Sequence, residues 1–249
     1  MIYFQQQAHQ DLRDYVRCYW KLENKNKDFQ YYTILPDGFF DLLICFHNDN
    51  LDGVFLTGLW DHKTNVVISP ETTIYGVQFR LLAIENIIQE SITLLLNNIK
   101  GLQKSYLGLD GFNKNIDSCF FEYLNRCLLS YIEEQDPIDP RKCILLKSIN
   151  QTKGNKTVEY YSQKANWSKR QINRYFQSTF GLSLKRYCSI RKCAATFSQI
   201  RKGQLFPEEG YFDQPHFIKE IKKIAGFTPK VLLKNENDRF LQFSIIKNK

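Results

Sequence analysis

The first 80 residues alternate short apolar stretches with turn-forming residues. Five stretches rich in Phe, Tyr, Ile, Val and Thr predict β-strands: Gln30–Leu35, Phe39–Phe46, Gly53–Gly58, Asn65–Ser69 and Thr72–Arg80. Gly, Pro, Asn and Asp separate these stretches, as in Pro36-Asp37-Gly38. Apolar positions between residues 11 and 20 predict a short helix before the strands. Short strands at this spacing predict a β-sandwich or a small barrel.

The pattern changes to helical spacing after residue 80. Apolar residues recur at three- and four-residue steps in Leu81–Ile99, Asp117–Glu134 and Pro140–Ile149. The helices between residues 117 and 149 could pair two chains, but packing onto their own β-domain is the preferred interpretation. The polar stretch Gln151–Lys156 contains Gly154 and predicts a domain boundary, with one domain over residues 1–150 and another over 151–249.

The net charge of the chain changes sign at the same place. The net charge is −5 over residues 1–150 and +13 over residues 151–249, which together give the +8 of the whole chain. A positive excess confined to about 100 residues creates a field that attracts a polyanion. Charge alone does not separate this interpretation from a basic but merely soluble domain.

A capped helix in the basic part has one apolar and one polar face. Ser168 is a good N-cap for a helix over Lys169–Phe180, and Gly181 suits its C-terminal end. The apolar face is formed by Ile172, Phe176 and Phe180. The other face carries Arg170, Asn173, Arg174 and Gln177. Arg and Asn side chains form bidentate hydrogen bonds with guanine and adenine, so this face suits a DNA major groove.

The residues before Ser168 predict a helix-turn-helix unit. Thr157 is a good cap for a short helix from Val158 to about Ala165, and Asn166-Trp167 then forms the turn. Asn tolerates the left-handed backbone that such a turn needs. A short helix, a tight turn and a capped polar helix are typical of this motif.

The pattern repeats after 45 residues. Ser168 corresponds to Asp213, Gly181 to Gly226, and Leu182–Lys185 to Phe227–Lys230. This agreement indicates a duplicated recognition helix. A helix over Leu184–Ile200 between the copies would span about 26 Å. We therefore expect two recognition helices held near one turn of DNA apart, roughly 34 Å, in successive major grooves.

These features give the predicted fold class as α+β. A β-sandwich or barrel-like N-terminal domain with following helices precedes an all-α C-terminal domain, in which a long helix joins two helix-turn-helix units. Residues 157–234 resemble the DNA-binding domain of the AraC/XylS family of transcription regulators. The resemblance is carried by Ser168, Arg170, Arg174, Phe176, Gly181, Ser183, Tyr187, Arg191, Gly210-Tyr211-Phe212-Asp213-Gln214, His216-Phe217, Lys222 and Gly226-Phe227-Thr228-Pro229.

The resemblance implies a DNA-binding surface and partners. Arg170, Asn173 and Arg174 fall at base-contacting positions, and Gln214, His216 and Lys219 fall at exposed positions of the second recognition helix. The complete set of expected DNA-contacting residues is Lys169, Arg170, Gln171, Asn173, Arg174, Gln177, Gln214, His216, Lys219 and Lys223. The expected partners are double-stranded DNA, RNA polymerase, a small-molecule effector and a second copy of the chain.

One departure from the family affects the second unit. The family places a full scaffold helix before the second recognition helix, but only Gly203–Glu209 occupies that position here. Pro207 can begin a helical turn but cannot lie inside a longer helix. We therefore expect an abbreviated second unit.

The N-terminal part resembles, more weakly, a sensor-like domain of some relatives of this family. The matching residues are Tyr19-Trp20, Pro36-Asp37-Gly38, Asp41-Leu42, Gly58 and Gly76-Val77-Gln78-Phe79-Arg80. Asp37 and Gly38 are interpreted as a strand-joining turn. Arg80 either pairs with a buried carboxylate such as Asp41 or binds an acidic effector, and the pair is the preferred interpretation. No residue pattern identifies an effector.

Other classes of function find little support. The sequence has no phosphate-binding glycine loop, zinc-protease motif or nucleophile-elbow motif, so we expect no enzymatic activity, cofactor or metal site. The seven cysteines are expected to be small buried hydrophobes. Neither a signal peptide nor a membrane span is apparent, so we expect a cytoplasmic protein. The alternative function is a small-molecule sensor or enzyme whose basic tail binds RNA or an acidic partner.

Overall fold

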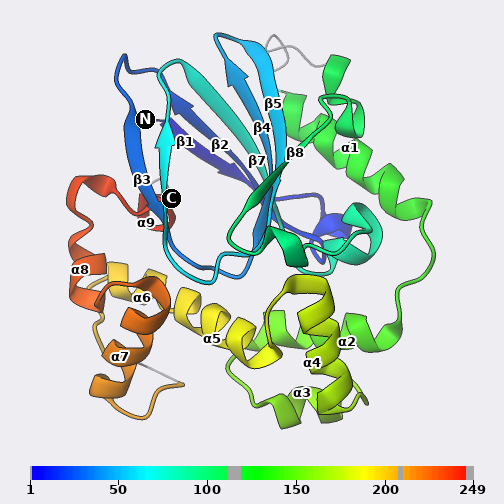
Figure 1. Ribbon diagram of the computed structural model, residues 1–249, viewed down its shortest axis with the longest axis vertical. Coiled ribbons are helices and arrows are strands. Elements are labelled where there is room, and N and C mark those ends of the chain that lie inside the picture. Colours follow the sequence, from blue (N-terminus) through cyan, green and yellow to red (C-terminus); the bar gives the residue numbers. More distant parts are fainter. Residues whose placement is uncertain (1, 112–118, 207–209, 245–249) are drawn as a thin grey trace.

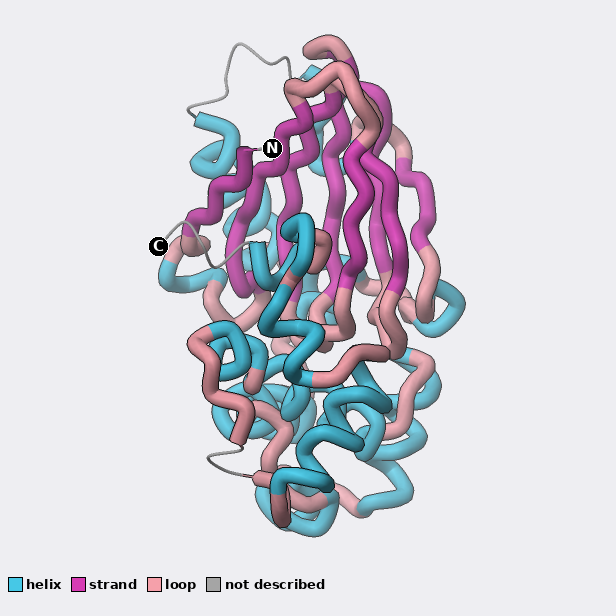
Figure 2. Tube along the Cα trace, turned by 90° about the vertical axis from the view of Figure 1, so that its left-hand side faces the viewer, coloured by secondary structure: helices cyan, strands magenta, loops and turns pink. Residues whose placement is uncertain are grey.

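The computed structural model describes residues 2–111, 119–206 and 210–244. Figure 2 shows the strands gathered in one half of the molecule and most helices in the other. This is the α+β architecture expected from the sequence, with an antiparallel sheet first and helices afterwards.

The main sheet is antiparallel and has six strands in the order β1-β2-β7-β4-β5-β8. Their bounds are β1 Ile2–Gln6, β2 Val16–Asn24, β7 Thr72–Phe79, β4 Phe40–His47, β5 Asn50–Thr57 and β8 Ile99–Leu102. Residues alternate between the two faces of β4, as expected for a strand. Phe40, Leu42, Ile44 and Phe46 are fully buried, whereas Asp41 and Leu43 line a cavity.

A second, two-stranded sheet pairs β3 (Gln30–Ile34) with β6 (Thr64–Ile68). The C-terminal end of the chain joins it, because the Thr33 amide donates to the Arg239 carbonyl over 2.7 Å. The turn at residues 36–38 connects β3 to β4, which confirms the strand-joining turn at Asp37 and Gly38.

Helix α1 (Phe120–Glu133) lies beside the main sheet (Figure 1), and its aromatic residues pack on the sheet. The rings of Phe120 and Tyr75 lie 4.3 Å apart, and those of Phe121 and Tyr19 lie 5.4 Å apart. The preferred packing of this helix onto its own β-domain is therefore confirmed. The start of the expected helix, at Asp117, lies outside the described residues.

The helical half follows from residue 140. Its helices are α2 Pro140–Thr152, α3 Val158–Lys164, α4 Lys169–Phe180, α5 Leu184–Ala195, α6 Phe197–Arg201, α7 Gln214–Ala225, α8 Pro229–Lys234 and α9 Leu241–Ser244. The expected domain boundary after residue 150 falls inside the last turn of α2. That helix ends where Lys153 and Gly154 take left-handed backbone conformations.

Two expected helices in the N-terminal half are wrong. The segment between residues 11 and 20 has only a 3₁₀ turn at Gln10–Leu12 before β2 begins, because its apolar residues are used within a strand paired on both sides. Leu81–Ile99 contains a π-helical turn at Ile84–Ile88, a 3₁₀ turn at Thr93–Leu95 and the start of β8. The chain reverses at Gln89 and Asn97, where φ is positive.

Two side-chain expectations are also wrong. The Arg80 Nε donates to the Arg13 carbonyl over 2.9 Å, whereas Asp41 accepts from the Trp20 indole over 2.8 Å, so Arg80 and Asp41 do not form the expected pair. Cys119 is exposed, while Cys18, Cys188 and Cys193 are buried and the remaining three are half-buried. The cysteines are therefore not all core residues.

Candidate nucleic-acid interface

Helices α3 and α4 form the expected helix-turn-helix. The Thr157 hydroxyl accepts from the Tyr160 amide over 3.2 Å at the start of α3, and Asn166 takes a φ of 48° in the turn. At the start of α4, the Ser168 hydroxyl accepts from the Gln171 amide. Gly181 ends α4 with a φ of 75°, so the cap and stop residues inferred from the sequence are confirmed.

One face of α4 is an aromatic part of the core. Ile172, Phe176 and Phe180 are fully buried, and Tyr175 is nearly so. The Phe176 ring lies 5.1 Å from Phe180 and 5.6 Å from Tyr187 of α5. This packing fixes the rotation of α4 about its axis and therefore determines which side chains face solvent.

The opposite face of α4 carries the residues expected to contact DNA. Lys169, Arg170, Gln171, Arg174 and Gln177 are exposed, and Asn173 is half-buried. Arg170 and Arg174 have no hydrogen-bond or ion-pair partner among the residues that the structure describes. Their guanidinium groups are therefore available to an external acceptor.

Two of the expected residues already have local partners. Lys169 pairs with Glu159 of α3, and this contact lowers the pKa of the Glu159 carboxyl. The Gln171 carboxamide oxygen accepts from the Ser168 amide over 3.2 Å and from its hydroxyl over 2.7 Å. Gln171 therefore completes a capping box, a structural role that the sequence analysis did not assign to it.

Helix α7 repeats α4 at the expected offset of 45 residues. Both helices have 12 residues, Asp213 caps α7 by accepting from the His216 amide over 2.8 Å, and Gly226 ends it with a φ of 76°. The following helices also correspond, because Ser183 caps α5 and Thr228 caps α8. The repeat found in the sequence is thus a repeat of helices and caps.

The expected residues of α7 lie mainly on its surface. His216, Lys219 and Lys223 are exposed, and Gln214 is half-buried. Lys223 lies 3.7 Å from Glu220 on the same helix. The His216 Nδ1 accepts from the Phe212 amide over 3.3 Å, so this ring also stabilises the entry to α7.

The helix between the two units is shorter than expected. The single helix expected over residues 184–200 is interrupted at Thr196, where α5 gives way to α6. The Thr196 hydroxyl donates to the Cys193 carbonyl over 2.7 Å, a local bond that competes with the regular helix pattern. Figure 1 shows α4 and α7 on either side of α5.

The described residues just before α7 contain no helix that matches α3. Residues 203–209 correspond to α3 at the 45-residue offset, and the described part, residues 203–206, contains no helix. Pro207 lies outside the described residues. Helix α7 packs on α5, whereas α4 packs on both α3 and α5.

Residues of the N-terminal half bind the C-terminal end of α4. The Ile92 amide donates to the Thr179 carbonyl over 3.0 Å. The Ser91 hydroxyl donates to the Ser178 carbonyl over 2.7 Å, and the Thr93 hydroxyl donates to the same carbonyl over 2.9 Å. Helix termini leave carbonyls without partners inside the helix, and this segment supplies the donors.

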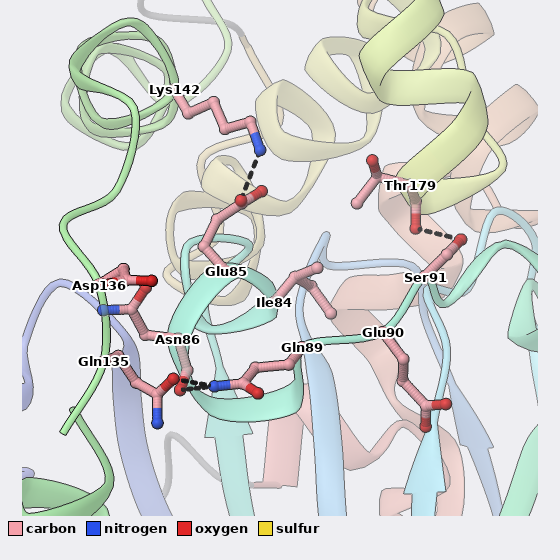
Figure 3. A pocket seen from close by; sticks show the side chains of 10 residues that line it. All are labelled: Ile84, Glu85, Asn86, Gln89, Glu90, Ser91, Gln135, Asp136, Lys142 and Thr179. Carbon is pink, nitrogen blue, oxygen red and sulfur yellow. Dashed lines mark hydrogen bonds and ion pairs between the residues drawn. The ribbon is translucent and has the colours of Figure 1, made fainter.

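A carboxylate completes this contact. Glu85 accepts from the Tyr175 hydroxyl over 2.7 Å. It also pairs with Lys142 of α2 over 2.6 Å, and Figure 3 shows this pair together with the hydrogen bond of 3.3 Å that the Ser91 hydroxyl donates to the Thr179 carbonyl. Burial and the Glu85 charge raise the pKa of Tyr175, so its hydroxyl stays a donor. Sequence analysis missed these positioning residues because they lie about 85 to 90 residues before α4, and no local pattern connects them to it.

Two further findings concern membranes and metals. In the described part of the chain, no helix has the length and apolar character needed to cross a bilayer. No cluster of three or more His, Cys, Asp or Glu residues suited to a metal ion occurs within residues 2–111, 119–206 and 210–244.

Comparison with known proteins gives the following similarities. A family model described as a domain of unknown function (DUF6597) matches residues 5–99. No curated protein sequence matches the chain. Among solved structures, ToxT from Vibrio cholerae has a TM-score of 0.43 at 10% identity, over 86% of this chain and 95% of that chain.

Two other ToxT structures give similar values. A variant of apo ToxT has a TM-score of 0.46 at 9% identity, over 92% of this chain and 98% of that chain. Wild-type ToxT bound to an unsaturated fatty acid has a TM-score of 0.42 at 11% identity, over 86% and 93%.

Proposed function

We propose that this protein is a sequence-specific, double-stranded DNA-binding transcription regulator of the AraC/XylS type. The observation that carries the proposal is the outer face of α4. There Arg170 and Arg174 extend from a capped helix whose opposite face is fixed in the core. A rigid helix with uncommitted guanidinium groups has the shape and chemistry that a major groove requires.

Three further features support the proposal. The net positive charge lies within residues 151–249, where it would neutralise phosphates. The 45-residue repeat supplies a second helix, α7, with exposed Lys219 and Lys223. The motif residues of 157–234 match the pattern of the AraC/XylS family. In this proposal α4 contacts bases through Arg170, Asn173 and Arg174, and α7 enters an adjacent groove.

The remaining parts of the chain receive roles in the same proposal. Residues 1–150 act as a sensor or dimerisation domain, and residues 151–249 bind DNA. The protein works in the cytoplasm, without catalytic activity. It acts as an activator that contacts RNA polymerase, and it binds DNA as a homodimer.

Selection of bound duplexes from a random DNA pool tests this function. We expect one enriched sequence, whose affinity for the purified chain is then measured by fluorescence anisotropy at several salt concentrations. The variant Arg170→Ala/Arg174→Ala should lose specific binding. The control Lys27→Ala/Arg126→Ala removes the same charge from exposed positions of the N-terminal half and should bind normally.

Two outcomes would overturn the proposal. One is the absence of duplex affinity even at low ionic strength, where phosphate contacts are strongest. The other is stronger binding to single-stranded RNA than to any duplex, which would favour the alternative of a sensor with a basic RNA-binding tail.

A further inference from the structure

A cavity of about 520 Å³ lies inside the β-rich half and extends to the helical half. The six-stranded sheet contributes Trp20, Asp41 and Leu43 to its wall, and the β3–β6 sheet contributes Ile68. Helix α5 contributes Arg191, and α6 contributes Phe197. Most of the wall is apolar or aromatic, which is typical of a site for a small organic molecule.

Three arginines gather around one ring in this wall. The guanidinium carbon of Arg191 lies 4.1 Å from the centre of the Phe39 ring, that of Arg17 4.6 Å, and that of Arg80 6.0 Å. Burial and the charges of Arg191 and Arg17 lower the pKa of Arg80. Like charges collected in a partly buried place favour an anionic ligand that offsets their repulsion.

Arg191 is the best-defined member of this cluster. Only 8% of its surface is exposed, one terminal nitrogen donates to the Asp37 carbonyl over 2.7 Å, and its buried Nε has no partner. A buried donor without an acceptor costs free energy that a ligand oxygen would recover. The close packing of the Arg191 side chain on the backbone of residues 37 and 38 depends on Gly38, because a Cβ atom there would lie 2.3 Å from the Arg191 Cδ.

The two carboxylates of the wall offset only part of the arginine charge. Asp37 accepts from the Phe39 amide over 3.1 Å and from the Gln78 side chain over 3.3 Å, and it lies 3.9 Å from Arg17. Asp41 accepts from the Trp20 indole. Burial raises the pKa of Asp37, and burial together with the Asp37 charge raises the pKa of Asp41 to about 7. The carboxylates therefore offset less of the arginine charge than their number implies.

We propose that this cavity binds a small organic acid, with its carboxylate held by Arg17, Arg80 and Arg191 and its apolar body against Trp20 and Leu43. A planar guanidinium matches a carboxylate through two parallel hydrogen bonds, and the apolar wall provides contacts for an organic body that a bare inorganic ion lacks. Arg17 and Arg80 belong to the sheet side, whereas Arg191 belongs to α5. The ligand thus contacts both halves of the molecule.

A matched series of probes tests the charge preference on the purified full-length protein without DNA. The probes are 4-phenylbutyrate, 4-phenylbutanol and 4-phenylbutylamine, which differ mainly in the head group. Binding is followed by quenching of tryptophan fluorescence, because Trp20 and Trp60 line the cavity, and by the rise in Tm. We expect saturable binding of the acid, about tenfold or more tighter than that of the alcohol and the amine.

Substitutions of single arginines test whether the acid binds at the proposed place in the cavity. Arg17→Met should weaken binding of the acid about tenfold, and it is suitable because 42% of the Arg17 side chain is exposed, so folding should tolerate the change. Arg191→Met should weaken binding at least as much. Arg126→Met, at an exposed position of α1, is the control and should bind normally. Equal binding by Arg17→Met and the native protein, or preference for the amine, would overturn the proposal.

A role for the acid as effector rests on the proposed function. The acid contacts α5, which lies between α4 and α7. Binding of the acid should therefore change the affinity for duplex DNA, and binding of duplex DNA should change the affinity for the acid by the same factor. At a concentration close to its Kd for the native protein, 4-phenylbutyrate should shift the duplex Kd of the native protein and shift that of Arg17→Met much less. An unaltered Kd in a protein that binds both would overturn the effector role, whereas absent duplex affinity with intact acid binding would overturn only the DNA-binding proposal.

Discussion

Arg174 is the side chain whose role in base recognition is easiest to isolate. It is exposed on α4, whereas the adjacent Tyr175 is buried in the core, so truncation of Arg174 should leave the fold unchanged. We predict that Arg174→Ala costs about 1–3 kcal/mol of binding at the selected site and relaxes the preference at one base pair. Anisotropy titrations with the selected duplex and its single-base variants measure both effects. An equal loss on every sequence would reassign Arg174 to a phosphate contact.

Lys223 is expected to contact a phosphate. Its ammonium group is exposed on α7 and its neighbour Glu220 lies 3.7 Å away. Lys223→Ala should weaken binding to all duplexes alike and reduce the slope of log K against log salt by about 1. Lys223→Arg keeps the charge and should keep the slope. An unchanged slope for Lys223→Ala would contradict this role.

Asp41 makes stability depend on pH. Its pKa rises from the ordinary value of 3.8 to about 7 in the folded state, mainly through burial and also through the Asp37 charge. Between these values the unfolded chain has lost the proton that the folded chain retains, so stability falls as pH rises from about 4 to about 7 and stays lower above it. Asp41→Asn removes this effect and keeps an acceptor for Trp20.

Asp41→Asn should therefore have a free energy of unfolding about 2–4 kcal/mol higher than that of the native protein at pH 8. The difference should be much smaller at pH 4.5. Urea unfolding of both proteins at the two pH values measures the difference. The same difference at both pH values would mean that Asp41 does not titrate in this range.

At the scale of elements, the cap residues of α4 determine where the helix begins and ends. The Ser168 hydroxyl and the Gln171 carboxamide form a reciprocal capping box. Ser168→Ala should lower the free energy of unfolding by about 1 kcal/mol, because it leaves backbone donors of the first turn without an acceptor. Ser168→Asp keeps an acceptor and should recover most of the loss in urea unfolding. Equal losses for both variants would show that the side-chain acceptor at residue 168 does not account for the loss.

The helices of the C-terminal half were predictable and several N-terminal elements were not. Helices α3, α4 and α5 each begin at a cap residue and α4 also ends at a stop residue, so local chemistry identifies these ends, whereas α5 has no stop residue and its end at Thr196 was not predicted. Residues 81–99 have the apolar spacing of a helix. However, Leu81, Ile84 and Ile87 are buried, and the chain then turns at Gln89 to contact α4. The spacing of apolar residues predicts which residues are buried, but it does not predict the path of the backbone between them.

At the scale of the whole molecule, the contact of residues 91–93 with α4 joins the two halves. Ser91→Ala/Thr93→Val removes two hydroxyl donors from carbonyls at the end of α4. Because these hydrogen bonds are exposed, we expect a stability loss of only about 1 kcal/mol, but faster amide exchange in the last turn of α4. Hydrogen-exchange mass spectrometry measures this, with the last turn of α7 as the internal reference.

Ser105→Ala, at an exposed position in the turn after β8, is the matched control and should leave exchange unchanged. Equal acceleration in α4 and α7 would indicate general destabilisation rather than a local loss of contact. Unchanged exchange in both helices would show that the segment does not hold α4.

The sequence by itself determined the features that depend on neighbours along the chain. These are the alternation of the strands, the caps and stops of α4 and α7, their 45-residue repeat and the separation of charge. Only the tertiary structure decided the features that depend on distant residues meeting: Glu85 on Tyr175, and Arg17, Arg80 and Arg191 around Phe39. Hydrogen bonds and charges act over a few ångströms of space, and more than 100 residues separate Arg191 from Arg80, so no sequence window contains such an arrangement.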